Sequence, residues 1–371
     1  MKVETRTAQY MEILSHLVIP GGRTTPSPLQ QPDGNLLRGE VHFVGSLTDA
    51  ELADLHSLAN SNHVIVRALT ALRCGAGLEN ETRVADWCTT ILSMERARIE
   101  RALTYLQSIC SALESRGCDI SVIKSLDHWP DLGSDLDLYT TADPRDVKQW
   151  MRAEFGAHPV ERSWGDRLAN KWNYSVPGLP ELVEIHVQYL GQTGEHAEIA
   201  RRVIRRRRPT AVGGFEFFVP APEERIVIST LQRIYRHFYF RLCDMIDTAS
   251  LLRTGAVDFD ELRAVANSAG IWPGVATYLC LIRNYLEAYG DLLFLPDSVI
   301  ESAHSADSNV MFKAGFLRVP KTKAAGLYGL QLLQAGLRRD VRALVRLPLL
   351  PPLAVSALVA HTLTGNDKGI W

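Results

Sequence analysis

The chain has 371 residues, and its 46% apolar and 22% charged side chains exclude a wholly disordered protein. The chain contains 40 Lys and Arg residues and 42 Asp and Glu residues. The resulting formal charge of −2 argues against a protein that binds nucleic acid over a broad cationic surface. The length predicts two or three domains. Six cysteines at scattered spacings form no metal-binding pair, so we expect reduced thiols and a cytoplasmic location. No signal peptide is evident in residues 1–18.

Residues 1–116 are predicted to form a helical region. After a short first helix and a turn-rich stretch at 19–35, Thr48 and Glu51 have the spacing of a capping box. The longest stretch with apolar residues at three- and four-residue spacing ends at Gly117. The predicted helices after the turn-rich stretch cover residues 48–56, 64–72 and 81–115.

The pattern changes to alternating polar and apolar residues in the central part, residues 117–220. Four strands are predicted, at residues 120–123, 135–139, 171–176 and 182–189. A helix is expected at 144–155, and the turn residues 177–180 predict a hairpin between the last two strands. Residues 221–371 are helical again, with helices predicted at 223–252, 258–268, 273–289 and 324–347. The predicted fold class is α+β, a small mixed sheet flanked by N-terminal and C-terminal helical regions.

Two aspartates in the second predicted strand are the first candidate site residues. Asp135 and Asp137 are two positions apart, so their side chains project from the same face of a strand. Adjacent carboxylates repel each other unless a cation lies between them, and Mg²⁺ prefers such oxygen ligands. The alternative to a metal site is a surface strand that carries two acids on its solvent-exposed face.

A third carboxylate favours the metal site. In the last predicted strand, Glu184 and His186 project from one face, while the intervening residues are apolar. Glu184 from a neighbouring strand would complete a cage for two Mg²⁺ ions, as in two-metal phosphoryl transfer. Glu181 is a competing third acid, but it lies near the predicted turn and on the apolar face.

These residues resemble a known family. The segments Ile123-Lys124-Ser125, Gly133 to Leu138 and Val183 to His186 are similar to the signature of the polymerase-β-type nucleotidyltransferases, and the most similar group is the uncharacterised nucleotidyltransferase family. The later segments Phe218 to Arg225, Tyr235 to His237 and Arg241 to Asp247 fit the same pattern. The resemblance covers about residues 105–255 and implies a nucleotidyltransferase core at 117–220.

The resemblance implies two-metal nucleotidyl transfer from an NTP, with pyrophosphate as the leaving group. Asp135, Asp137 and Glu184 would be the catalytic residues and would bind two Mg²⁺ ions. The implied nucleotide-binding residues are Lys124, Ser125, Ser134 and His186. The expected acceptor is a small molecule or a peptide, with RNA a less favoured partner. Ser125 departs from the family pattern, which has glycine after the lysine.

Two further segments leave alternatives open. Six arginines in residues 201–208 either clamp an anion such as RNA or, as we favour, lie at a solvated helix end and offset carboxylates elsewhere. Residues 344–363 are apolar but contain prolines and an arginine, so we favour a packed segment over peripheral membrane contact. Two alternatives to a small-molecule nucleotidyltransferase remain: a non-catalytic binding module of the same fold, and a tRNA-modifying nucleotidyltransferase.

Overall fold

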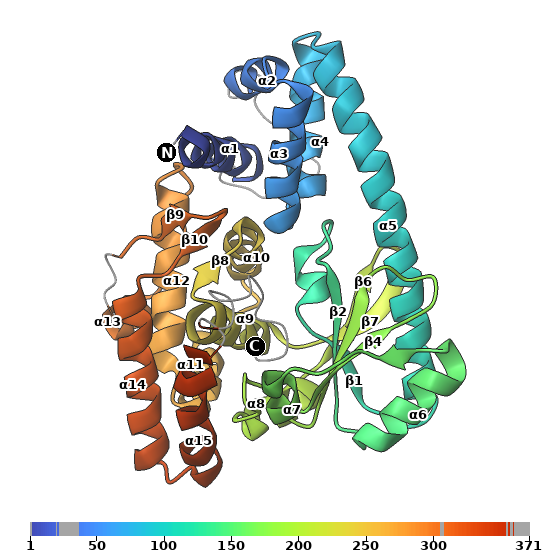
Figure 1. The fold of residues 1–371 in the computed structure, drawn as a ribbon. Helices are drawn as coiled ribbons and strands as arrows, with labels where there is room; N and C mark the ends of the chain where they lie inside the picture. The colour runs from blue at the N-terminus through green and yellow to red at the C-terminus, as the bar shows by residue number, and fades with distance from the viewer. Residues whose placement is uncertain are drawn as a thin grey trace.

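A mixed five-stranded sheet forms the centre of the fold and carries the predicted acids (Figure 1). The strand order is β1-β2-β5-β4-β3, in which β2 and β5 are parallel and the other neighbours are antiparallel. Its strands are β1 (Ile120–Val122), β2 (Asp135–Thr140), β3 (His158–Pro159), β4 (Lys171–Ser175) and β5 (Leu182–Val187). All four strands predicted from the sequence are present, and the α+β class is confirmed.

In this computed structural model, the described residues are 2–19, 21, 37–304, 308–353, 355, 356 and 359. The turn-rich stretch predicted at 19–35 therefore lies, apart from residues 19 and 21, outside the described part of the chain.

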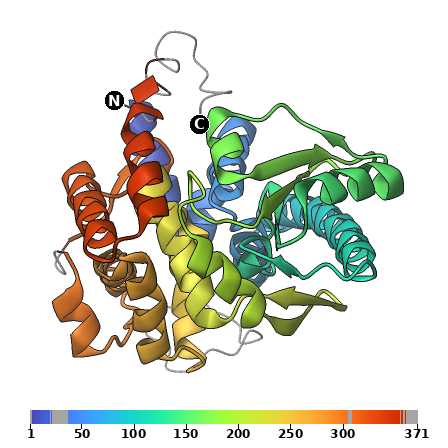
Figure 2. The ribbon, with the colours of Figure 1, turned by 90° about the horizontal axis from the view of Figure 1, so that it is seen from below.

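Helices cover the sheet on both sides. The long helix α5 (Thr82–Glu114) runs along one side of it, and the helices of the C-terminal region lie on the other (Figures 1 and 2). The other N-terminal helices are α1 (Lys2–Val18), α2 (Arg38–Gly45), α3 (Asp49–Ser61) and α4 (Ile65–Leu78). Thr48 and Glu51 form the predicted capping box, because Glu51 Oε2 accepts from the Thr48 amide at 2.9 Å.

The central part contains short elements that the sequence analysis did not predict. They are α7 (Trp164–Ala169), α8 (Ala197–Arg205), β6 (Arg208–Val212) and β7 (Phe215–Val219), in addition to β3; α6 (Pro144–Phe155) has its predicted bounds. A local signal existed for β6 and β7, since Gly213 and Gly214 join them with φ of 58° and 84°. Two-residue hairpin turns of this kind require positive φ at both positions.

The prediction of a single helix at 223–252 is wrong. The structure has α9 (Pro222–Gln232), a π-helical turn (Arg233–His237), β8 (Tyr239–Phe240) and α10 (Leu242–Arg253). Phe238 adopts φ of 58°, and β8 pairs with the distant strand β10 (Phe316–Arg318), which also pairs with β9 (Met311–Lys313). The buried Arg233 also forms an ion pair with Asp244 at 2.8 Å. These long-range contacts outweigh the local helical periodicity.

The helix predicted at 324–347 is also interrupted. It consists of α14 (Lys321–Leu337) and α15 (Val341–Arg346), followed by a 3₁₀ turn (Leu347–Leu349). Arg339 has φ of 55°, and Asp340 accepts from the Ala343 amide at 3.0 Å, so a new helix begins there. The remaining helices are α11 (Phe259–Ala269), α12 (Trp272–Glu287) and α13 (Asp297–Ser302).

The arginines near the apolar C-terminal segment bind the protein itself. Arg342 donates to the Gly194 carbonyl at 2.7 Å, Arg346 donates to the Leu168 carbonyl at 2.7 Å, and Arg338 donates to the Asn267 carbonyl. Within the described residues, no helix is long and apolar enough to cross a bilayer. Part of the segment 344–363, at 354, 357, 358 and 360–363, lies outside the described residues.

One hydrophobic core joins the three predicted regions. Its buried members extend from Tyr10 to Leu327, and a small separate cluster contains Ala335, Ala343, Leu347 and Leu350. The division at 1–116, 117–220 and 221–371 therefore stays a prediction.

Replacing Arg233 with Met leaves the buried Asp244 carboxylate without its cation. We expect the free energy of unfolding to fall by about 3–5 kcal/mol, measured by denaturant unfolding. The exposed Arg152 on α6 is the matched control, and Arg152→Met should change this free energy by less than about 0.5 kcal/mol. Equal effects of the two substitutions would contradict the importance of this ion pair.

Candidate active site

The parallel pairing of β2 with β5 brings the predicted acids together. Asp137 lies opposite Glu184, and Asp135 lies opposite Leu182, so the three carboxylates come from neighbouring positions of two adjacent strands. Leu136 and Leu138, which alternate with the aspartates, are fully buried. The face of β2 that carries Asp135 and Asp137 therefore projects away from these core side chains.

Three of the side chains are close enough to share one cation. Ligand atoms of Asp137, Glu184 and His186 all lie within 4.8 Å of one another. Asp135 is outside this group but is electrostatically part of the same face. Burial and the neighbouring charges of Asp137 and Glu184 raise the pKa of Asp135 to about 6. Such a group gains from a bound cation, which would favour its charged form.

Lys124 lies between two of the acids. Its ammonium forms an ion pair with Asp137 and is 3.4 Å from Glu184 Oε1. Its backbone turns sharply at the end of β1, with φ of 63°. The predicted phosphate-binding lysine is therefore held at the carboxylates by the loop that follows β1.

Lys171 is a site residue that the sequence analysis missed. It is buried at the start of β4, where its ammonium lies 2.9 Å from Glu184 Oε2 and 2.8 Å from Asp166 Oδ1. Burial alone would raise the pKa of Glu184, but Lys124, Lys171 and His186 hold it well below its usual range. The signal lay in the predicted hairpin, whose register places Lys171 opposite His186.

Ser125 binds the backbone of β2. Its hydroxyl accepts from the Asp137 amide at 2.7 Å and donates to the Asp135 carbonyl at 3.1 Å. The left-handed residue of this loop is Lys124, so position 125 has no conformational need for glycine. Ser134 is exposed at the start of β2, with its hydroxyl 3.5 Å from Asp135 Oδ2. Ser125 thus holds the two aspartates in place, while Ser134 is accessible to a ligand.

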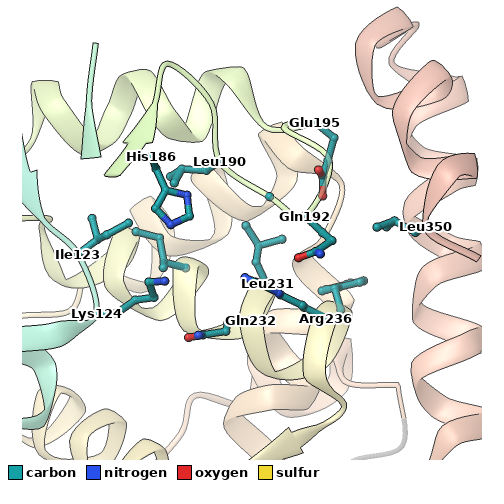
Figure 3. Close-up of a pocket in the computed structure, with 13 residues that line it drawn as sticks. Ile123, Lys124, His186, Leu190, Gln192, Glu195, Leu231, Gln232, Arg236 and Leu350 are labelled. Carbon is teal, nitrogen blue, oxygen red and sulfur yellow. The ribbon is translucent and has the colours of Figure 1, made fainter. Parts of the chain in front are cut away.

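A cavity of about 50 Å³ opens beside Lys124 and His186 (Figure 3). His186 and Lys124 lie at one end of it, and Leu350 lies at the other. Its remaining walls come from the end of β1, the loop after β5, α9 and the π-helical turn. Most of its lining is apolar, as is typical of small-molecule sites.

The arginine-rich segment is paired within the protein. Arg206 binds the buried Glu223 at 2.9 Å, Arg202 binds the buried Glu224 at 3.0 Å, and both reach Glu261. Arg207 binds Asp119 at 2.8 Å. Arg201 and Arg205 both pair with Glu198 on their own helix. The interpretation that these arginines offset carboxylates is confirmed. Most of their positive charge is therefore neutralised within the protein and is not available to bind an anion.

The family model described as "Uncharacterised nucleotidyltransferase" matches residues 49–287, more than half of the chain. The chain belongs to this nucleotidyltransferase family. The match contains α3 to α12 and the whole five-stranded sheet, whereas α14 and α15 lie outside it. The membership supports nucleotidyl transfer as the activity.

Two solved structures are similar to parts of the chain. The antibiotic-resistance factor ANT(2'')-Ia is 14% identical, with 45% of this chain and 91% of that chain covered at a TM-score of 0.34. An antigenic nucleotidyltransferase-like protein from Paracoccidioides brasiliensis is 16% identical, with 53% and 95% covered at a TM-score of 0.34. No curated protein matches the chain.

Substituting Ser125 with Ala removes both hydroxyl hydrogen bonds to β2. The Asp137 amide and the Asp135 carbonyl then lose their partner, so the free energy of unfolding should fall by about 1–3 kcal/mol. Denaturant unfolding of Ser134→Ala, at the exposed serine, is the control and should show less than about 0.5 kcal/mol. A neutral Ser125→Ala would show that the hydroxyl does not hold the strand.

Arg206 and Arg205 should differ in their contribution to stability. Arg206→Gln leaves buried carboxylates undercompensated and should lower the free energy of unfolding by about 2 kcal/mol or more. Arg205 pairs at the surface, so Arg205→Gln should cost less than about 1 kcal/mol. Thermal and denaturant unfolding would measure both, and a larger loss for Arg205→Gln would contradict the structural role of Arg206.

Proposed function

We propose that this protein is a Mg²⁺-dependent nucleotidyltransferase that moves a nucleoside monophosphate from an NTP to a hydroxyl group on a small-molecule or peptide acceptor. The observation that carries the proposal is the meeting of Asp135, Asp137 and Glu184 on adjacent parallel strands, in a chain that belongs to a nucleotidyltransferase family. The acceptor oxygen would bond to the α-phosphorus as the bond to the β-phosphate oxygen breaks, and pyrophosphate would leave.

The donor set fits magnesium. Asp135, Asp137 and Glu184 offer carboxylate oxygens, which are hard ligands, and the ligand atoms of Asp137 and Glu184 lie within 4.8 Å of each other. When bound, two Mg²⁺ ions neutralise charge on the triphosphate and activate the attacking hydroxyl. The Lys124 ammonium, which is already beside these carboxylates, lies within reach of phosphate oxygens bound there.

The structure suggests different roles for Glu184 and His186. The low pKa of Glu184 suits a metal ligand, because a carboxylate that is hard to protonate is a weak base. His186 Nε2 lies 2.7 Å from Glu184 Oε1, which orients the ring. His186 Nδ1 is buried and has no hydrogen-bond partner among the described residues. In our proposal His186 orients Glu184 and contacts the acceptor, whose hydroxyl proton passes to solvent.

The two alternative functions, transfer to tRNA and a non-catalytic binding module, are supported to different degrees. A tRNA acceptor depended on the arginine-rich segment, and most of those arginines are bound to carboxylates. A non-catalytic module is the main competitor, and the test below decides between them. Peripheral membrane contact through residues 344–363 and the cytoplasmic location stay predictions.

The activity is tested with α-labelled NTPs, Mg²⁺ and a pooled metabolite or peptide extract as acceptor. Pyrophosphate release and label transfer should fall about a hundredfold or more in Asp135→Asn and in Asp137→Asn, because each loses several kcal/mol of charge stabilisation. Asp260→Asn, at an exposed aspartate on α11, is the matched control and should retain activity.

Three outcomes decide the assignment. Undiminished turnover in both aspartate variants would reject the catalytic site. Undiminished turnover in Glu184→Gln would reject Glu184 as the third acid. Failure of the wild type to bind any NTP would favour the non-catalytic module.

A further inference from the structure

The cavity beside the acids is reached from one end of the catalytic face. His186 and Lys124 line it, whereas Asp135, Asp137 and Glu184 do not. In the register of β2 and β5, His186 lies two residues beyond Glu184 and four beyond Leu182, the partner of Asp135. The cavity thus extends from the Glu184 end of the site, where the proposed chemistry places the acceptor hydroxyl.

Two side-chain amides in the cavity have no partner in the described protein. Gln192, on the loop after β5, is 8% exposed, and Gln232 ends α9. No hydrogen bond to another described residue satisfies either amide, although both line a mostly apolar space. Gln192 is buried and Gln232 is half-buried, so both amides are available to hydrogen-bond a polar ligand in this cavity.

Arg236 gives the cavity an uncompensated positive charge. The nearby arginines Arg233 and Arg225 are paired, with Asp244 and Asp127. Arg236 has no ion pair with a described carboxylate, and its Nε is buried without a hydrogen-bond partner. Burial, followed by the charges of Arg236 and other nearby cations, lowers the pKa of the adjacent His237 well below its usual range.

Among the described residues, Glu195 is the one carboxylate that lines this cavity, and it hydrogen-bonds within its own loop. Its Oε2 accepts from the Thr193 amide at 2.8 Å and from the Thr193 hydroxyl at 3.0 Å. It therefore closes the turn and leaves Arg236 without a counter-ion. The rest of the wall, from Ile228, Leu231 and Leu350, is apolar.

We propose that this cavity binds the acceptor, and that the acceptor is a small hydroxylated molecule with an apolar body and a carboxylate or phosphate group. The inference rests on the proposed function. The hydroxyl lies at the His186 end, the anionic group binds Arg236, and Gln192 and Gln232 hydrogen-bond the polar atoms between. The acceptor oxygen bonds to the α-phosphorus, its proton is released to solvent, and pyrophosphate leaves with the electron pair of the broken bond.

The far wall supports an acceptor over the nucleoside half of the NTP. Leu350 follows α15, which lies outside the family match at residues 49–287. The catalytic face belongs to the part that the family shares. A substrate that contacts both Leu350 and the shared catalytic face would be specific to this chain. This is expected of the acceptor and not of the NTP.

The probe for the cavity is 8-anilinonaphthalene-1-sulfonate, which combines an apolar aromatic body with an anionic group. Its fluorescence gives the dissociation constant for the wild type and for four variants. Arg236→Gln should weaken binding about tenfold, since hydrogen bonds to charged groups contribute at least that much, and Arg236→Lys should restore most of it. Gln232→Trp, which fills the cavity, should weaken binding as well.

The matched control is Arg208→Gln, at an exposed arginine of β6, and it should leave the dissociation constant unchanged. This control accounts for the loss of one positive charge, whereas dye bound elsewhere, for example at the exposed Leu337 and Val341, contributes equally to the wild type and all variants. Circular dichroism confirms that each variant is folded. Equal binding by wild type, Arg236→Gln and Gln232→Trp would overturn the proposal.

A second titration separates the acceptor cavity from the nucleotide site. An NTP analogue with a non-hydrolysable α,β bond, at a concentration that calorimetry shows to be saturating, should leave the dye bound. Displacement would make the cavity part of the nucleotide site and overturn the proposal. If the wild type releases pyrophosphate but Arg236→Gln leaves the dissociation constant of the dye unchanged, the inference fails and the proposed function stands. If the dye needs Arg236 but no NTP binds, both the proposed function and the acceptor role fail, and a small-anion site is left.

Discussion

The site depends on placing three carboxylates on two adjacent strands inside a protein. The parallel register of β2 and β5 sets Asp137 beside Glu184. Like charges at this separation repel strongly where water is scarce. Lys124 and Lys171 approach the pair from two different elements, and the pKa of Glu184 stays low as a result. Without these two ammonium groups, the pKa of Glu184 would rise, because burial disfavours its charged form.

The same balance of buried charge joins the helical regions to the sheet. Arg202 and Arg206 on and after α8 bind Glu223 and Glu224 on α9, so the C-terminal helices are attached beside the central core. On the N-terminal side, Arg67 of α4 binds Asp247 of α10 at 2.6 Å. His128, in the turn after Lys124, binds the same carboxylate at 2.6 Å. A net charge of −2 therefore conceals pairs whose loss would leave charges buried.

The sequence was informative where local periodicity decides the structure. Alternation over β2 and β5 placed the acids on one face, and the apolar spacing of α5 predicted one long helix. It failed where a distant partner decides, as at Phe238, where pairing with β10 ends the helical pattern. Lys171 was missed because its role comes from strand pairing, and the predicted hairpin alone does not fix the register that brings this lysine to Glu184.

In our proposal, chemistry and selectivity are separated along this chain. The acids and their lysines lie within the family segment, on strands fixed by the main core. The outer wall of the cavity includes Leu350, which follows the hairpin of α14 and α15 and belongs to the small cluster of buried residues of that hairpin. That wall is positioned largely by polar contacts, from Arg342 and Arg346 to carbonyls of the central part. In our proposal, substitutions at Leu350 would alter the shape of the acceptor cavity without disturbing the buried charges of the site.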